Sequence, residues 1–313
     1  MQAKGYFCLM RLKIPPYLKK GDCIGLVCPA GAMSRKKAVE CIRVIKEVWG
    51  YEVKQGKTLG SGAGYFSGTD QERLDDLQRM IDDDEIKAIL CARGGYGTGR
   101  IIDVIDFSKF RKKPKWIIGF SDITVLHAHI HSTYGIATLH APMANAFNNG
   151  GYNNVYVKSL KDALEGKRAQ YKTASKKYNR SGKGNGQLIG GNLAIITHLI
   201  GTPSSYQTKG KILFLEDVGE LKYNIDRMVY QLKRSGMLKD LSGLVIGGFT
   251  DTKDTSKPFG KSVEEIFTDA VKEYDYPVCF DFPVSHSKEN LALKVGARFE
   301  LKVTQKNVYL NEI

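Results

Sequence analysis

The sequence lacks several features that would point to a membrane or secreted protein. Its apolar runs, of which 116–120 is typical, fall far short of the roughly 20 residues that a membrane helix needs. Residues 1–13 hold scattered Lys and Arg and no apolar segment followed by small residues, so they do not form a secretory signal. The six cysteines include no C-x-x-C pair, which favours free, mostly buried thiols. We therefore expect a cytoplasmic protein with no membrane partner.

Proline is also scarce, with nine in 313 residues, while 42% of the residues are hydrophobic. This is the composition of a chain that buries a sizeable core, and it excludes disordered, collagen-like and coiled-coil proteins. At roughly 150 residues per domain, the length predicts about two domains.

Acidic residues are too few to balance the basic ones, since 33 Asp and Glu face 47 Lys and Arg, for a net charge of +14. Seven basic residues and no acid fall within 166–186. Such a stretch is either a contact for nucleic acid or another polyanion, or a solvated connector. Because stacking aromatics do not recur there, we expect a connector between domains at 1–165 and 187–313, and no nucleic-acid partner.

Predicted strands and helices alternate before the connector, which indicates an α/β domain built on a parallel sheet. The expected strands are 22–28, 88–91 and 116–120, and the expected helices are 34–49 and one that begins at a capping box over 69–72. After the connector the pattern predicts a smaller, mixed β/α domain. Its expected strands are 211–216, 244–249, 299–303 and 308–310, and its expected helices are 224–234 and 262–274.

A serine follows one of the predicted buried strands, where the chain turns into a segment of helical period. Ser121 in W-I-I-G-F-S-D-I-T could therefore present its hydroxyl above the carboxyl edge of a parallel sheet. The backbone amide of Asp122 at the helix start could then face a developing oxyanion. A serine before an aspartate is equally typical of a helix N-cap, so both interpretations stay open here.

A glycine-rich turn follows the strand at 88–91, with glycines at 94, 95, 97 and 99. It matches neither the G-x-x-x-x-G-K-[ST] nor the G-x-G-x-x-G phosphate-binding pattern. The turn is either a backbone donor for an oxyanion or simply a tight connection between strand and helix.

The histidines give little sign of a metal site. On a helix His127 and His131 share a face while His129 does not, and no Glu or Cys accompanies them, so we expect no metal. His286 differs, because it lies in a loop just past a predicted strand. Glu216 ends another strand, where a buried carboxylate needs a partner. Ser121, Glu216 and His286 thus follow the order nucleophile, acid, base that one kind of catalytic triad uses.

Several motifs together resemble those of the LD-carboxypeptidase family, serine peptidases that include murein tetrapeptide carboxypeptidases and a microcin-immunity branch. The resemblance covers nearly the whole chain, and its motifs lie at 15–18, 28–31, 64–70, 93–97, 119–124, 190–193, 215–217, 226–228 and His286. One departure is Cys28, which stands where many members have Ser before Pro-Ala-Gly.

The resemblance implies a Ser121 nucleophile, a His286 base oriented by Glu216, and an oxyanion hole from the amides of Asp122 and Gly95. The implied substrate is a murein tetrapeptide, cleaved between the L-centre of a dibasic residue and the terminal D-Ala, with no metal or other cofactor. This triad would assemble at the interface of the two domains, and we expect a homodimer. The candidate substrate-binding residues are Arg93, Gly94, Gly191 and Asn192, although Arg93 could equally be a structural partner of the glycine turn.

Two other functions remain open at this stage. One is hydrolysis of peptide-nucleotide antibiotics, as in the immunity branch. The other is a non-enzymatic module that binds nucleic acid through the basic stretch at 166–186.

Overall fold

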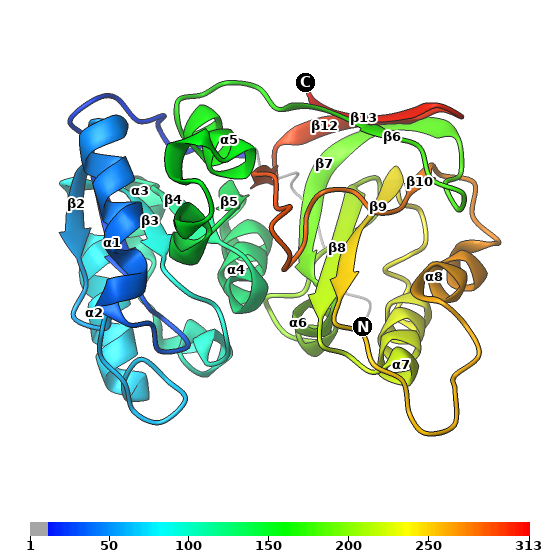
Figure 1. Ribbon diagram of the computed structural model, residues 1–313, viewed down its shortest axis with the longest axis horizontal. Coiled ribbons are helices and arrows are strands. Elements are labelled where there is room, and N and C mark those ends of the chain that lie inside the picture. The colour runs from blue at the N-terminus through cyan, green and yellow to red at the C-terminus, as the bar shows by residue number, and fades with distance from the viewer. Residues whose placement is uncertain (1–11) are drawn as a thin grey trace, which may run out of the picture.

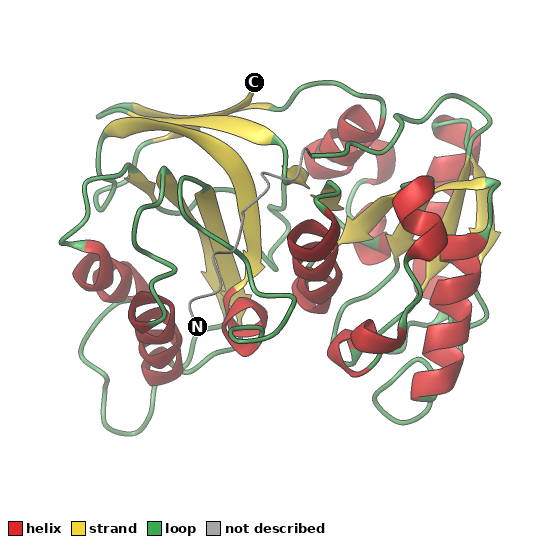
Figure 2. Ribbon diagram, turned by 180° about the vertical axis from the view of Figure 1, so that it is seen from behind, coloured by secondary structure: helices red, strands yellow, loops and turns green. Residues whose placement is uncertain are grey.

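A computed structural model describes residues 12–313, which form two sheet-based halves lying side by side (Figure 1). Helix α4 (Thr124–Tyr134) lies between the two sheets (Figures 1 and 2). Buried apolar side chains form two clusters, one of which runs across both halves and includes Ile130 of α4, Leu193 and Leu213. No helix within 12–313 is long and apolar enough to cross a membrane.

The first sheet has six strands in the order β11-β5-β4-β3-β1-β2. These are β1 (Cys23–Val27), β2 (Glu52–Gln55), β3 (Ile86–Cys91), β4 (Trp116–Gly119), β5 (Thr138–His140) and β11 (Leu293–Val295). The first five run parallel, and β11 pairs antiparallel with β5. The parallel sheet predicted at 22–28, 88–91 and 116–120 is therefore confirmed.

Helices cover both faces of this sheet, which explains why its central strand β4 is apolar throughout and β3 is apolar apart from Lys87. They are α1 (Arg35–Arg43), continued by a π-helix over Val44–Val48, α2 (Asp70–Asp82), α3 (Ser108–Lys112), α4 and α5 (Val155–Leu164). Helix α2 begins at the predicted capping box, in which the side chains of Thr69 and Glu72 each accept a bond from the other's backbone amide. Short 3₁₀-helices occupy Thr98–Arg100, Ile102–Val104, Ser121–Ile123, Ala144–Asn148 and Gly151–Asn153.

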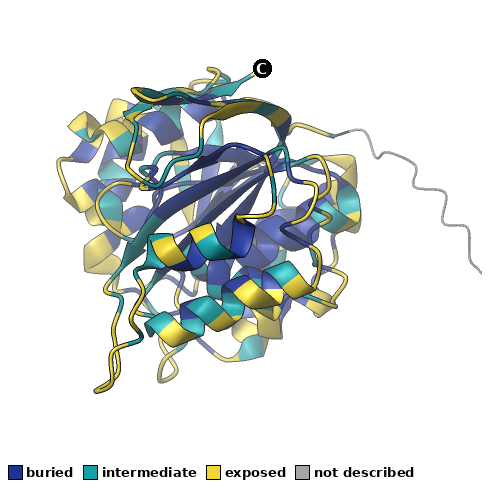
Figure 3. Cartoon of the chain, turned by 90° about the vertical axis from the view of Figure 1, so that its right-hand side faces the viewer, coloured by how far each residue is buried: buried dark blue, intermediate teal, exposed yellow. Residues whose placement is uncertain are grey.

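The second sheet is mixed, as predicted, with seven strands in the order β10-β9-β8-β7-β12-β13-β6. These are β6 (Gln170–Ala174), β7 (Gly182–Asn192), β8 (Ile212–Val218), β9 (Gly243–Thr250), β10 (Val278–Cys279), β12 (Arg298–Val303) and β13 (Asn307–Glu312). Its helices are α6 (Leu193–His198), α7 (Lys222–Arg234) and α8 (Val263–Val271). Strands β8 and β9 are mostly buried, and Figure 3 shows the outer faces of the helices exposed.

The segment 166–186, expected as a solvated connector, is instead part of the second sheet. Strand β6 pairs with β13 at the sheet edge, and the first half of β7 pairs with β12. Side chains along β6 alternate between exposed and half-buried, and Lys172 points into solvent. Charged edge strands are common because lysines discourage pairing with a second molecule. The basic residues therefore belong to a folded edge rather than to a linker.

The expected second domain, 187–313, does not stay within the second sheet, because the C-terminal part of the chain returns to the first sheet. Strand β11 pairs Leu293 with His140 of β5. The loop at 280–292 thus starts from β10 in the second sheet and ends on β11 in the first. His286 lies in this loop, which is fixed at both of its ends.

Candidate active site

Ser121, two residues after the end of strand β4, has a backbone conformation that serines rarely adopt, with a φ of 63°. It is the first residue of the 3₁₀-helix that leads into α4, and neither that helix nor α4 has a side-chain cap hydrogen bond. The N-cap interpretation of Ser121 is therefore wrong. A strained residue at such a turn is a sign of function, because the surrounding structure must hold it there.

The glycine turn after β3 packs directly against this serine. A Cβ atom added to Gly94 would lie 2.9 Å from the Cβ of Ser121 and 3.2 Å from its Oγ. Gly95 has a φ of 100° and lies against Gly31, whose amide donates to the Gly94 carbonyl at 2.9 Å. The turn can approach the serine only because it carries no side chains there.

Asp122 connects the serine to the same turn. Its Oδ2 accepts a hydrogen bond of 2.8 Å from the amide of Thr98, and its side chain is buried. Burial raises the pKa of this carboxyl above its usual range. The residue after the serine therefore has a structural side chain, while its backbone amide lies at the start of the 3₁₀-helix.

His286 and Glu216 form the pair that the sequence predicted. The Nδ1 of His286 lies 2.6 Å from the Oε2 of Glu216, which is fully buried in β8. The His286 ring contacts the ring of Phe120, with centroids 4.9 Å apart, so it lies beside the residue that precedes Ser121. Its Nε2 has no hydrogen-bond partner within residues 12–313. The imidazole is thus oriented by Glu216 through one nitrogen and leaves the other nitrogen free.

The charges around His286 favour its protonated form. Burial alone would lower its pKa, but the hydrogen bond and charge of Glu216, with the charge of Asp217, outweigh burial and raise the pKa above its usual value. Burial also raises the pKa of Asp217 to about 6, and the neighbouring charge of Glu216 acts in the same direction.

Gly191 and Asn192, two of the candidate substrate-binding residues, lie where β7 meets α4 rather than along the pocket described below. A Cβ on Gly191 would lie 2.5 Å from the Oγ1 of Thr124. The side chain of Asn192 donates to Asp217 at 2.8 Å and accepts from the amide of Ile195 at 3.1 Å, so its polar atoms are already used.

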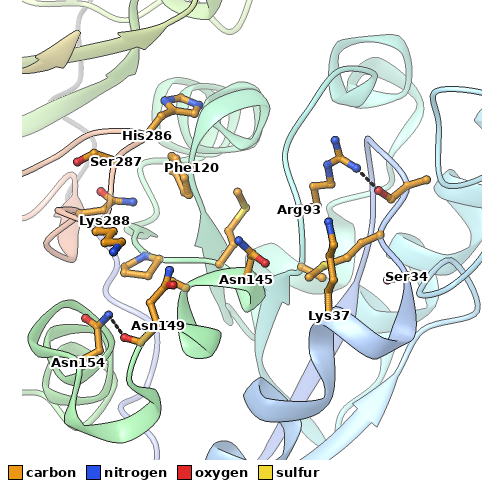
Figure 4. Close-up of a pocket in the computed structure, with 17 residues that line it drawn as sticks. Ser34, Lys37, Arg93, Phe120, Asn145, Asn149, Asn154, His286, Ser287 and Lys288 are labelled. Carbon is orange, nitrogen blue, oxygen red and sulfur yellow. Dashed lines mark hydrogen bonds between the residues drawn. The ribbon is translucent and has the colours of Figure 1, made fainter. Parts of the chain in front are cut away.

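A pocket of about 680 Å³ opens beside His286 and Phe120 (Figure 4). Arg93 lines it and also donates from Nη1 to the carbonyl of Ala32, so both interpretations of this arginine are compatible with its position. The pocket is also lined by four polar residues that the sequence analysis did not identify, namely Lys37, Asn145, Asn149 and Lys288. Only Lys288 had a signal, its closeness in sequence to His286.

The three histidines of α4 contact different partners. The Nε2 of His127 donates to the Gly119 carbonyl at 2.8 Å, the Nδ1 of His129 lies 2.9 Å from the Ser204 hydroxyl, and the Nε2 of His131 lies 3.2 Å from Lys211 Nζ. Burial lowers the pKa of His127 to about 4, so it stays neutral and supports the backbone just before Ser121. Within the described part of the chain, no three His, Cys, Asp or Glu side chains are grouped to hold a metal ion.

Comparison with known proteins identifies the family. The chain matches the LD-carboxypeptidase N-terminal domain over residues 24–141 and the LD-carboxypeptidase C-terminal domain over 185–301. It therefore belongs to the LD-carboxypeptidase family, whose members are peptide hydrolases of the carboxypeptidase type.

Individual relatives cover almost the whole chain. A probable murein peptide carboxypeptidase of Bacillus subtilis is 37% identical over 301 residues, covering 95% of this chain and 93% of the relative. The crystal structure of a muramoyltetrapeptide carboxypeptidase from Oxalobacter formigenes is 28% identical and has a TM-score of 0.84, covering 93% of this chain and 98% of that one. The microcin C7 self-immunity protein MccF of Escherichia coli is 24% identical over 331 residues, covering 94% of each chain.

Proposed function

We propose that this protein is a serine LD-carboxypeptidase of murein tetrapeptides. It would hydrolyse the amide between the L-centre of a dibasic residue and the terminal D-Ala, as a cytoplasmic step of peptidoglycan recycling. The observation that carries the proposal is the His286–Glu216 pair, with a free Nε2 beside the strained turn of Ser121. The family and the names of its relatives support the substrate class.

The reaction begins when the Ser121 Oγ attacks the carbonyl carbon of the scissile amide. His286 Nε2 takes the serine proton, and Glu216 stabilises the imidazolium through Nδ1. The negative charge on the substrate oxygen is received by the amides of Asp122 and Gly95. Collapse of this intermediate breaks the C–N bond, and His286 returns the proton to the departing D-Ala nitrogen.

The second half of the reaction releases the acyl group. Water, deprotonated by His286, attacks the ester on Ser121, and the serine regains its proton as the tripeptide leaves. Every proton transfer uses His286, which explains why its Nδ1 must be held by a buried carboxylate while Nε2 stays free.

The test is to incubate the purified protein with muropeptides and to follow D-Ala release by mass spectrometry. Release of D-Ala from tetrapeptides, and not from pentapeptides that end in D-Ala-D-Ala, is the expected result. No release from any tetrapeptide would contradict the proposal.

A second candidate function is hydrolysis of peptide-nucleotide antibiotics, favoured by the likeness to MccF along the whole chain. The discriminating measurement compares an aminoacyl-sulfamoyl nucleoside with the tetrapeptide as substrates. Cleavage of the sulfamoyl compound with no action on the tetrapeptide would decide for this second function.

A further inference from the structure

The pocket beside His286 is lined by basic side chains and, within residues 12–313, by no acidic ones. Three cationic side chains line it, from Lys37 on α1, Arg93 after β3 and Lys288 in the loop that carries His286. No Asp or Glu of the described chain lines it. Lys288 lies on the same side as His286 and Phe120, while Lys37 and Arg93 lie across the pocket from them (Figure 4). A ligand with two separate carboxylates can therefore meet a cation at each end.

A tetrapeptide whose third residue is lysine fits this lining poorly. Its side chain ends in a bare ammonium, which would enter a pocket that holds three like charges and no carboxylate to pair with. A diaminopimelate side chain ends in an ammonium and a carboxylate together, so its net charge is zero. Its carboxylate can pair with a cation of the pocket, and the side-chain amides of Asn145 and Asn149 offer oxygens to its ammonium.

From this charge pattern we infer that Lys37 and Lys288 select a third residue whose side chain carries a free carboxylate, as diaminopimelate does, over lysine. The inference rests on the proposed function, because it concerns the substrate of that reaction. The carboxylates of D-Glu and of the terminal D-Ala are common to both tetrapeptides and do not discriminate between them.

The experiment compares kcat/KM for three tetrapeptides that differ only at the third residue, which is diaminopimelate, diaminopimelate amidated at its side-chain carboxyl, or lysine. The amidated peptide keeps the size of the side chain and removes only the negative charge. We expect the diaminopimelate peptide to exceed the amidated one on the order of tenfold, since one charge-assisted hydrogen bond is lost. The lysine peptide should be the slowest.

The double variant Lys37→Gln/Lys288→Gln tests the residues themselves. It should lower kcat/KM for the diaminopimelate peptide far more than for the amidated one, so that their ratio falls toward one. Lys36→Gln is the matched control, because Lys36 is an exposed neighbour on α1 that does not line the pocket, and it should keep the wild-type ratio.

The outcomes separate the two proposals. Equal rates on the diaminopimelate and lysine peptides would overturn the selectivity and leave the proposed function standing. A wild-type preference that survives in the double variant would overturn the assignment to Lys37 and Lys288. If none of the three peptides is cleaved, the proposed function fails and the selectivity fails with it.

Discussion

The two halves of the molecule hold their parts of the proposed site in different ways. On the first half, Ser121 is held by backbone geometry, with a positive φ and a glycine turn that fits against it without side chains. On the second half, His286 is held by one side-chain bond to a fully buried carboxylate. Backbone geometry fixes where an atom lies, whereas the buried pair also fixes the protonation and tautomer of the ring. Substitutions around Ser121 and substitutions around His286 should therefore lower activity for different reasons.

The largest effect is expected from Ser121→Ala, which removes the attacking oxygen and keeps the backbone. D-Ala release should fall below about a hundredth of the wild-type rate, since loss of a triad nucleophile typically costs far more than that. The variant should melt at nearly the wild-type temperature, because no cap hydrogen bond is lost. Substantial residual turnover in a folded variant would rule out the serine mechanism.

The next effect is on the other half, where Glu216→Gln keeps the shape of the side chain and removes its charge. The amide can hold His286 in the wrong tautomer, so kcat should fall on the order of 10⁴-fold with KM nearly unchanged. Steady-state kinetics on the tetrapeptide give this split. A raised KM with kcat intact would instead assign Glu216 to substrate binding.

Gly94→Ala should lower activity by displacing Ser121, without removing any group of the proposed triad. The added methyl would meet Ser121 and the Phe120 carbonyl, which lies 3.2 Å away, and the turn must shift to make room. We expect a loss of about 10- to 100-fold in kcat, with about 1–3 kcal/mol of lost stability. Gly99→Ala is the matched control, because nothing lies within 4 Å of an added Cβ there. Equal activity of the two variants would show that the turn does not position the serine.

The pH dependence of kcat/KM tests how Glu216 affects His286. Only the neutral imidazole can accept the serine proton, so kcat/KM should rise with pH through a midpoint above the ordinary histidine pKa of about 6.5. Glu216→Gln should lower the pKa of His286, which an NMR titration in the Ser121→Ala background can follow. In the folded protein the raised pKa stabilises the native state below about pH 6.5, and this contribution disappears as the pH rises through the folded value. A midpoint below pH 6.5 that stays the same in Glu216→Gln would contradict the pairing of His286 with Glu216.

The smallest effect is expected on the edge strand β6 and the turn after it, whose lysines do not line the pocket beside His286. Replacing the exposed Lys172, Lys176 and Lys177 together by Gln should leave the rate on tetrapeptide within about threefold. Arg180→Gln should behave differently, because its guanidinium donates to the carbonyls of Tyr276 and Val271 at 2.9 and 3.0 Å. It should lower the melting temperature without changing kcat. A collapse of activity in the folded triple variant would mean that this edge contacts substrate.

Local patterns in the sequence determined most elements and the positions of the three residues of the proposed triad, while the resemblance to the LD-carboxypeptidase family supplied their expected roles. Buried strands of a parallel sheet are apolar runs that end in turns, so Ser121 and Glu216 could be placed at strand ends from the sequence. The capping box at Thr69 likewise fixed the start of α2. These signals are readable because each depends on residues only a few positions apart.

Only the tertiary structure decided which distant segments meet. A polar edge strand such as β6 carries little local signal, because its pairing with β13 depends on residues more than a hundred positions away. The same holds for β11, which joins the C-terminal part of the chain to the first sheet and so fixes the second end of the loop that carries His286, whose first end follows β10. Lys37, Arg93 and Lys288 come from three separate segments and share only the pocket that they line. No local sequence pattern can identify residues that are related in this way.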